Sequence, residues 1–372
     1  MTAWTDPLLD AARRRADPDA DALLAELFAT SQIESANALF AHLRAVGGDP
    51  GPEAPPLLRD WLHENAQFPV EYDPALAEAG QKLFERIGVA AVMALFNRAL
   101  PQTYSIPSIA TVLAQTQRLT RDGARRVNET ARLVLDVGAP GGFGRTGHGV
   151  RACQQVRLVH AAVRIHVRRT GTWNPAFGAP INQEDQALTL QGFSGSTVAA
   201  LQQMGYDFTA EEEAAYLHVW QIAGHFLGVE PALRPGRLVD SLALVEAISR
   251  RHEADTPEGR ALTAALTVTQ QELLPGTIAD GVVPVMMRWL NGDRRADLLG
   301  VSRSLVPSAF TTPFGWINRF LDDRGDESKL AATLLQVFNH TLMNGVHDWY
   351  EKGQPAPLRI PTRLVLDGGL PT

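Results

Sequence analysis

Histidines are the residues of this chain best suited to binding a metal, and their spacing narrows the choice of site. The chain has ten histidines. No two of them stand four residues apart, as the zinc-binding helix of metalloproteases requires. No glutamate stands three residues before a histidine, which is the spacing of carboxylate-bridged di-iron bundles. The sequence therefore leaves a single histidine, or histidines from several helices, as metal ligands.

A single histidine inside a helical bundle commonly holds haem iron. His160 is the first candidate, because Arg157 and Arg164 stand three residues before it and four after it, on one face of a helix. These arginines could hold the haem propionates; the alternative is an Arg–His stripe that faces solvent or carboxylates. His225, in an apolar segment, is the second candidate ligand, or else a core histidine bonded to a carbonyl. A different metal held by His160, His218 and His225 also stays open.

Other catalytic motifs are missing from the sequence. It contains no glycine-rich dinucleotide fingerprint and no P-loop. Residues 192–196 read Gly-Phe-Ser-Gly-Ser, which differs from the Gly-x-Ser-x-Gly nucleophile elbow of hydrolases. Glu129 precedes an apolar run, so it is either a solvated residue or, if it points inward, a general base.

The composition indicates a globular protein with a substantial core. Of 372 residues, 45% are hydrophobic and 20% are charged, which suits one large domain or two ordinary ones. The net charge of −7, without a basic block, argues against nucleic-acid binding. Cys153 is the only cysteine, which excludes a disulfide framework. No apolar run suits a membrane span or a secretion signal, so we expect a cytoplasmic protein.

The hydrophobic periodicity is helical and predicts an all-α fold with a single main domain. We expect accessory helices in residues 1–65, the catalytic body in 66–352 and a proline-rich tail in 353–372. Thr209 and Glu212 form a capping box at the start of one helix. The predicted helices are two within 75–98, separated at Gly88, and others near 110–137, 150–169, 183–204, 209–227, 239–251, 257–272, 281–291 and 329–352.

One predicted helical segment is unusual because it carries no charge. Between Asp185 and Asp207 lie 21 consecutive residues without a formal charge. A helix without a charged face is usually buried on all sides. Polar side chains such as Thr189 and Gln191 then need partners, either carbonyls of the core or a ligand.

Five blocks of sequence follow one another between about residues 80 and 228. They read Leu-Pro-Gln-Thr-Tyr at 100–104, Arg-Arg-Val-Asn-Glu-Thr-Ala at 125–131, Val-Arg-Leu-Val-His-Ala-Ala-Val-Arg at 156–164, Ile-Asn-Gln-Glu-Asp at 181–185, and Ala-Tyr-Leu-His-Val-Trp-Gln at 215–221, which runs on to Gly-His-Phe-Leu-Gly-Val at 224–229. In this order they resemble the latex clearing proteins (rubber oxygenases) and the related mpaB-type oxygenases. The block at 156–164 is the most specific.

This resemblance implies an all-α fold with a globin-like core, b-type haem and dioxygen-dependent cleavage of polyisoprene double bonds. Glu129 matches the glutamate proposed to take an allylic proton in the rubber-cleaving members. Gln191 stands where those members carry the proximal histidine, and Gln155-Val156 replaces a Lys–Thr pair on the distal side. Because glutamine is a poor ligand for haem iron, we expect another histidine, first His160 and then His225, to take its place.

The sequence thus predicts a haem-dependent oxygenase that acts with dioxygen on a small hydrophobic molecule, such as an isoprenoid or a lipid-like chain. One alternative, favoured by the missing proximal histidine, is a haem-free helical protein that binds an apolar ligand. Another is a non-haem metal enzyme with histidines from several helices. The predicted catalytic and cofactor-binding residues are Glu129, Arg157, His160, Arg164, Gln191 and His225.

Overall fold

The computed structural model describes residues 4–116, 123–144, 147–273, 278–303 and 359–361, and for residues 89, 123–129, 272–273 and 278–281 it describes the backbone alone. These residues form helices and connecting loops and contain no strand, which confirms the all-α prediction. The helix predicted at 329–352 and all but three residues of the predicted tail lie outside the described residues. Among the described helices, none combines the length and the apolar composition needed to cross a membrane.

The elements follow one another along the chain with short connections. The α-helices are α1 (Asp6–Arg14), α2 (Pro18–Ala29), α3 (Ile33–Val46), α4 (Pro56–Glu64), α5 (Pro74–Ala94), α6 (Leu100–Tyr104), α7 (Pro107–Gln115), α9 (Gly123–Gly138), α10 (Gly149–Thr170), α11 (Gln183–Phe193), α12 (Gly195–Gln203), α13 (Ala210–Phe226), α14 (Leu238–His252), α15 (Pro257–Leu273) and α16 (Ile278–Leu298). The shorter elements are a π-helical turn η1 (Leu95–Ala99) and the 3₁₀ turns η2 (Pro175–Phe177) and η3 (Pro231–Leu233).

Several helices begin at a side chain that bonds the unpaired amides of the first turn. Asp73 does so at the start of α5, and Asn182 at the start of α11. At α13 the Thr209 side chain and the Glu212 side chain form the predicted capping box. The capping box of α13 is the one of these helix starts that the sequence analysis predicts, and the structure confirms it.

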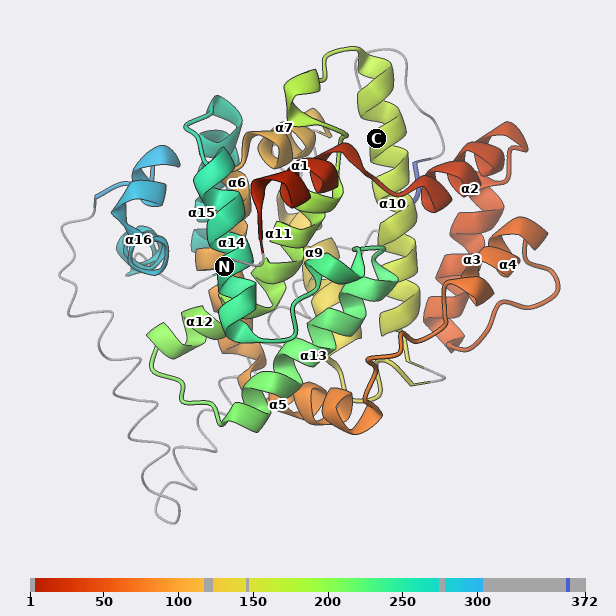
Figure 1. The fold of residues 1–372 in the computed structure, drawn as a ribbon, viewed down its shortest axis with the longest axis horizontal. Helices are drawn as coiled ribbons and strands as arrows, with labels where there is room; N and C mark the ends of the chain where they lie inside the picture. Colours follow the sequence, from red (N-terminus) through yellow and green to blue (C-terminus); the bar gives the residue numbers. More distant parts are fainter. Residues whose placement is uncertain (1–3, 117–122, 145–146, 274–277, 304–358, 362–372) are drawn as a thin grey trace.

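The apolar side chains form two cores on opposite faces of α10. α2, α3 and α4 lie together at one end of the molecule, next to α10 (Figure 1). Their buried residues, such as Leu24 and Leu58, pack on Leu158 and Ala162 of α10. α1 belongs to the other, larger core, where Leu9 is fully buried near α11. α10 is therefore the partition between the N-terminal helices and the main body.

α5 is one continuous helix, which corrects the predicted break at Gly88. A glycine inside a helix costs only about 1 kcal/mol, and the packing of α5 along α13 offsets that cost. This packing is close because Gly80 lies against the backbone of Ala215. A β-carbon at position 80 would collide with the Ala215 carbonyl oxygen.

The helical segment that follows α5 continues past Pro101, whereas the second helix predicted within 75–98 ends before this proline. Proline has no N–H, so the Asn97 carbonyl cannot bond to the amide four residues later. The helix widens here into the π-turn η1, and the Asn291 side chain on α16 donates to the Asn97 carbonyl oxygen at 2.6 Å. A side chain from a distant helix thus replaces the missing amide.

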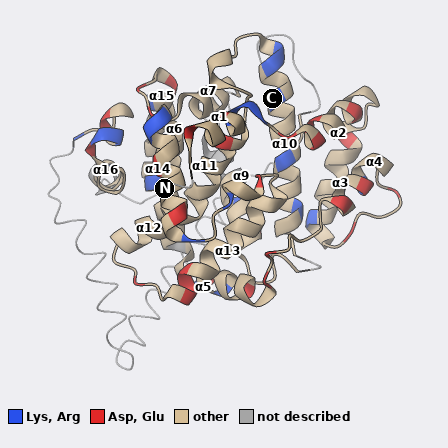
Figure 2. Ribbon diagram, viewed as in Figure 1, with Lys and Arg blue, Asp and Glu red and all other residues tan. Residues whose placement is uncertain are grey.

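The uncharged segment predicted to be buried lies at the centre of the fold. α11 and α12 divide it at Ser194, whose ψ of −108° is not helical, so the single predicted helix is corrected to two. In Figure 2 α12 carries no charged residue, whereas α2, α3 and α4 at one end of the molecule carry several. Most side chains of α11 and α12 are buried, as expected for a helix without a charged face.

The role of Asn291 can be tested by its removal. Asn291→Ala removes this side-chain donor from the Asn97 carbonyl, so we expect the free energy of unfolding to fall by about 1–3 kcal/mol. Urea denaturation measures this change. In a Pro101→Ala background the restored amide competes for the same carbonyl, so the cost of Asn291→Ala should shrink. Equal costs in the two backgrounds would contradict this explanation of the turn.

Candidate functional site

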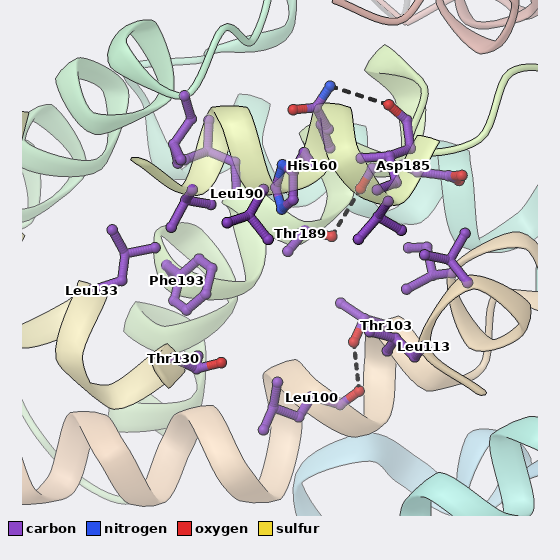
Figure 3. Close-up of a pocket in the computed structure, with 18 of the residues that line it drawn as sticks. Leu100, Thr103, Leu113, Thr130, Leu133, His160, Asp185, Thr189, Leu190 and Phe193 are labelled. Atoms are coloured by element: carbon purple, nitrogen blue, oxygen red, sulfur yellow. Dashed lines mark hydrogen bonds between the residues drawn. The ribbon is translucent and has the colours of Figure 1, made fainter. Parts of the chain in front are cut away.

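A cavity of about 220 Å³ lies between α10 and α11, and α6, α7 and α9 complete its walls (Figure 3). α10 contributes Val156, Val159, His160 and Val163, whose spacing places them along one stripe of the helix. Most other lining side chains are apolar, including Leu100, Ile109, Val112, Leu113, Leu133, Leu190 and Phe193. Among the described residues that line the cavity, none is a lysine or an arginine.

The polar groups of the cavity are unevenly distributed. Figure 3 shows His160, Asp185 and Thr189 on one side of the cavity, and Leu100 and Thr103 across from them. Both threonine hydroxyls are turned to their own helices, since Thr189 donates to the Asp185 carbonyl at 2.9 Å and Thr103 to the Leu100 carbonyl at 2.8 Å. Among the lining residues, His160 and Asp185 carry an imidazole and a carboxyl group, which are side chains that can exchange a proton with a molecule in the cavity.

The carboxyl group of Asp185 is held by two neutral donors. The Ser108 hydroxyl on α7 donates to Oδ1 at 2.8 Å, and the Asn182 amide donates to Oδ2 at 3.0 Å. Asn182 in turn accepts the Asp185 backbone N–H at 2.9 Å, so one residue caps α11 and orients the carboxyl. Asp185 is only 4% exposed.

Glu184, the preceding residue, lies in the opposite electrostatic environment. Its carboxylate accepts from Arg13 at 3.0 Å, Arg251 at 3.2 Å and His252 at 3.0 Å. Burial by itself would raise the pKa of Glu184, but these partners outweigh it and lower the pKa. For Asp185 burial prevails over the charge of Arg13 and raises the pKa to about 6. Such a separation of two neighbouring carboxyl pKa values is typical of acid–base sites.

The two arginines expected beside His160 do not line the cavity, which corrects the sequence prediction for both. Arg157 forms a bidentate pair with Asp17, at 2.9 Å through Nη2, and stacks on the ring of Trp61. Arg164 donates to Asp21 at 2.6 Å. Both guanidinium groups therefore point from α10 toward the N-terminal helices. Their charges are engaged there, and neither group is placed to touch a molecule in the cavity.

His225 lies outside the cavity, which corrects its prediction as a haem ligand. Its Nε2 lies 2.9 Å from the Gln67 carbonyl oxygen, so the alternative of a histidine bonded to a carbonyl is the one observed. His218 accepts the Asp73 backbone N–H at 3.0 Å. Burial lowers the pKa of both imidazoles. In the described part of the chain no three acidic, histidine or cysteine side chains gather as a metal site, so a centre built from His160, His218 and His225 is not formed.

The last two predicted site residues have different outcomes. Gln191 is buried behind the cavity wall and accepts the Ser241 hydroxyl at 2.7 Å, so it does not face the cavity as a proximal ligand would. Glu129 is on α9, one residue before Thr130, which lines the cavity. The Glu129 side chain lies outside the described residues, and its role as a base stays a prediction.

Sequence reasoning missed Asp185 as a site residue. It stands at the start of a helix, where an acidic side chain is ordinary because it complements the helix dipole. The available signal was its position at the edge of the long uncharged segment, directly before a helix expected to be buried. That position places a carboxyl group in the interior, where an ionisable residue is rare without a function or a partner.

Comparison with known proteins identifies the family of the chain. The family of catalytic domains described as ER-bound oxygenase mpaB/B'/Rubber oxygenase matches residues 81–319, and the chain belongs to it. This range contains every described residue of the cavity wall.

Two relatives show how far the similarity extends. The chain is 26% identical over 300 residues to the rubber oxygenase of Streptomyces sp. (strain K30). This alignment covers 78% of the present chain and 72% of the rubber oxygenase. The structure of the present chain is similar to that of latex clearing protein LCP in the closed state, with a TM-score of 0.75 and 23% sequence identity. The match covers 91% of the present chain and 90% of the LCP chain. At this identity the structural match establishes the shared helical fold.

The ion pair of Arg157 predicts a structural effect of its removal. Arg157→Leu leaves Asp17 buried without its partner, so we expect the free energy of unfolding to fall by about 3–5 kcal/mol. Arg168→Ala removes a half-exposed partner of Asp21 from the same helix and should cost less than about 1 kcal/mol. Chemical denaturation of both variants makes the comparison. Unchanged stability with loss of ligand binding would restore a catalytic role for Arg157.

The raised pKa of Asp185 predicts a pH dependence of stability. The folded chain binds the proton of Asp185 more tightly than the unfolded chain, whose aspartate has an ordinary pKa near 3.8. Stability from this group is therefore complete below about pH 4 and is lost as the pH rises through about 6. Asp185→Asn cannot titrate, so the unfolding free energy of the wild type minus that of the variant should fall by about 2 kcal/mol between pH 4 and 7. A difference that does not change with pH would contradict the assignment.

Proposed function

We propose that this oxygenase uses haem b and dioxygen to oxidise a small apolar substrate that binds between α10 and α11. The observation that carries the proposal is the position of His160. Its imidazole stands on the wall of a cavity that is otherwise largely apolar, in a chain of an oxygenase family. A single histidine in an apolar pocket is a common axial ligand of haem iron.

One donor of the cavity wall, the His160 imidazole, is of a type that binds haem iron. His160 is the only histidine among the described residues of the wall, and Gln191, which replaces the ligand expected from the resemblance, faces away from it. His160 would therefore hold the iron. Haem bound through one histidine supplies the binding and activation of dioxygen, and the protein supplies orientation and a dry environment.

The volume of the cavity limits how haem could bind there. An engineered cavity of about 150 Å³ holds benzene, so 220 Å³ accommodates roughly nine non-hydrogen atoms. A porphyrin is several times larger, and its entry requires the walls to separate. The propionates would need partners other than Arg157 and Arg164, whose charges are engaged by Asp17 and Asp21.

The chain's own residues have distinct roles in this proposal. The valines of α10 and the leucines of α6, α7 and α11 bind an isoprenoid or lipid-like chain and exclude water. Asp185 can hold or release a proton near neutral pH because burial raises its pKa to about 6. Glu129 precedes the lining residue Thr130 and is a second proton acceptor if its side chain faces the cavity.

A second function is favoured by two specific observations. The cavity is small for a macrocycle, and the residue in the expected proximal position, Gln191, is bonded to Ser241. Both suit a haem-free protein that binds an apolar ligand in the same cavity. This alternative predicts ligand binding without iron.

Haem binding by His160 is tested by an absorption spectrum. We expect the protein reconstituted with haem b to show a Soret band that His160→Ala abolishes, because the axial nitrogen is lost. His225→Ala is the matched control, since it removes a partly buried imidazole outside the cavity and should leave the band intact. If the wild type stays colourless after reconstitution and still binds an apolar ligand without iron, the second function replaces the first.

A further inference from the structure

We propose that the Asp185 end of the cavity selects substrates that carry a hydroxyl group on an apolar chain and rejects those that carry a carboxylate. The chemical class is therefore an alcohol of the isoprenoid or fatty type. The inference rests on the proposed function only in taking this cavity as the substrate site, and it does not depend on haem.

Asp185 has hydrogen-bonding capacity left for a ligand. An ionised carboxyl group can accept about four hydrogen bonds. Two come from the fold itself, from the Ser108 hydroxyl and the Asn182 amide, both neutral donors at 2.8 and 3.0 Å. The residue is almost fully buried and lines the cavity, so we infer that a donor group of a ligand in the cavity pairs with one of its remaining lone pairs. A hydroxyl group is the smallest organic donor that can supply it.

The charges around this end exclude an anionic ligand. No lysine or arginine occurs among the described lining residues. Arg13 is the nearest cation to Asp185, with Nη1 at 3.7 Å from Oδ1, but the same Nη1 donates to Glu184 at 3.0 Å and Arg13 does not line the cavity. A carboxylate in the cavity would lose its water shell and meet a second negative charge in a region of low dielectric.

The rest of the wall gives an alcohol a largely apolar binding surface, and three of its other polar side chains already donate to backbone carbonyls. The hydroxyls of Thr103 and Thr189 already donate to backbone carbonyls, and the Gln186 amide donates to the Ile181 carbonyl at 3.3 Å. A site that bonds a substrate hydroxyl discriminates strongly against analogues that lack it, because its polar group is then left unpaired.

Three ligands of matched size test the inference by isothermal titration calorimetry at about pH 8. Octan-1-ol, 1-methoxyheptane and octanoate each have about the number of non-hydrogen atoms that the cavity accommodates. We expect octan-1-ol to bind about tenfold or more tightly than octanoate, and more tightly than the ether, which has the oxygen without the donor. This comparison uses the wild-type protein alone.

Two variants test whether the preference for octan-1-ol over octanoate depends on Asp185. Asp185→Asn removes the charge and keeps the shape, so the ratio of the two dissociation constants, octanoate over octan-1-ol, should fall to within about threefold of unity. Thr103→Val changes a polar wall residue across the cavity and should leave the ratio unchanged. Octanoate binding as tightly as octan-1-ol to the wild type would overturn the inference and leave the cavity as a substrate site. Failure of all three ligands to bind would overturn both.

Discussion

The satisfaction of buried polar groups along α11 and α12 is the constraint on which the rest of this structure depends. Because these helices carry no charge after Asp185, they are packed on all sides, and each polar side chain left without a partner would cost about 1–3 kcal/mol. Gln191 therefore fixes α14 through Ser241, and Ser196 fixes α6 through Gln102. Asp185 fixes α7 through Ser108. The walls of the cavity thus stand at separations set by hydrogen bonds rather than by apolar contact alone.

α10 is oriented by a second set of interactions, on the side away from α11. The pairs of Arg157 with Asp17 and of Arg164 with Asp21 hold one edge of the helix against α2. Residues three and four apart form a stripe along a helix, and the stripe of Arg157 and Arg164 lies beside the stripe of Val156 and His160. When the arginine stripe is held against α2, the stripe with Val156 and His160 therefore lines the cavity next to α11. The N-terminal helices thereby position the cavity wall although they contribute no described residue to it.

Local patterns in the sequence were enough to predict the helical class, the capping box of α13, the burial of the uncharged segment and His160 as a candidate. They could not predict which side of α10 the arginines take, because the stripe with Arg157 adjoins the stripe with His160 and the choice depends on Asp17, 140 residues away. The same limit applies to Asp185, whose partner Ser108 is 77 residues distant. Helix continuity at Gly88 and at Pro101 was likewise decided by packing on α13 and by Asn291.

The adjacent carboxyl groups of Glu184 and Asp185 explain why the cavity wall contains a carboxyl group with a raised pKa and no arginine or lysine among its described residues. Successive residues of a helix point in directions about 100° apart, so one carboxylate reaches Arg13, Arg251 and His252 while the other reaches the cavity. Glu184 takes up the nearby positive charge, and its own pKa is lowered as a result. Asp185 is then left with neutral donors and a raised pKa, beside an imidazole and apolar walls. The cavity wall therefore combines apolar side chains with a carboxyl group whose pKa is raised by burial, and no lysine or arginine stands among its described residues.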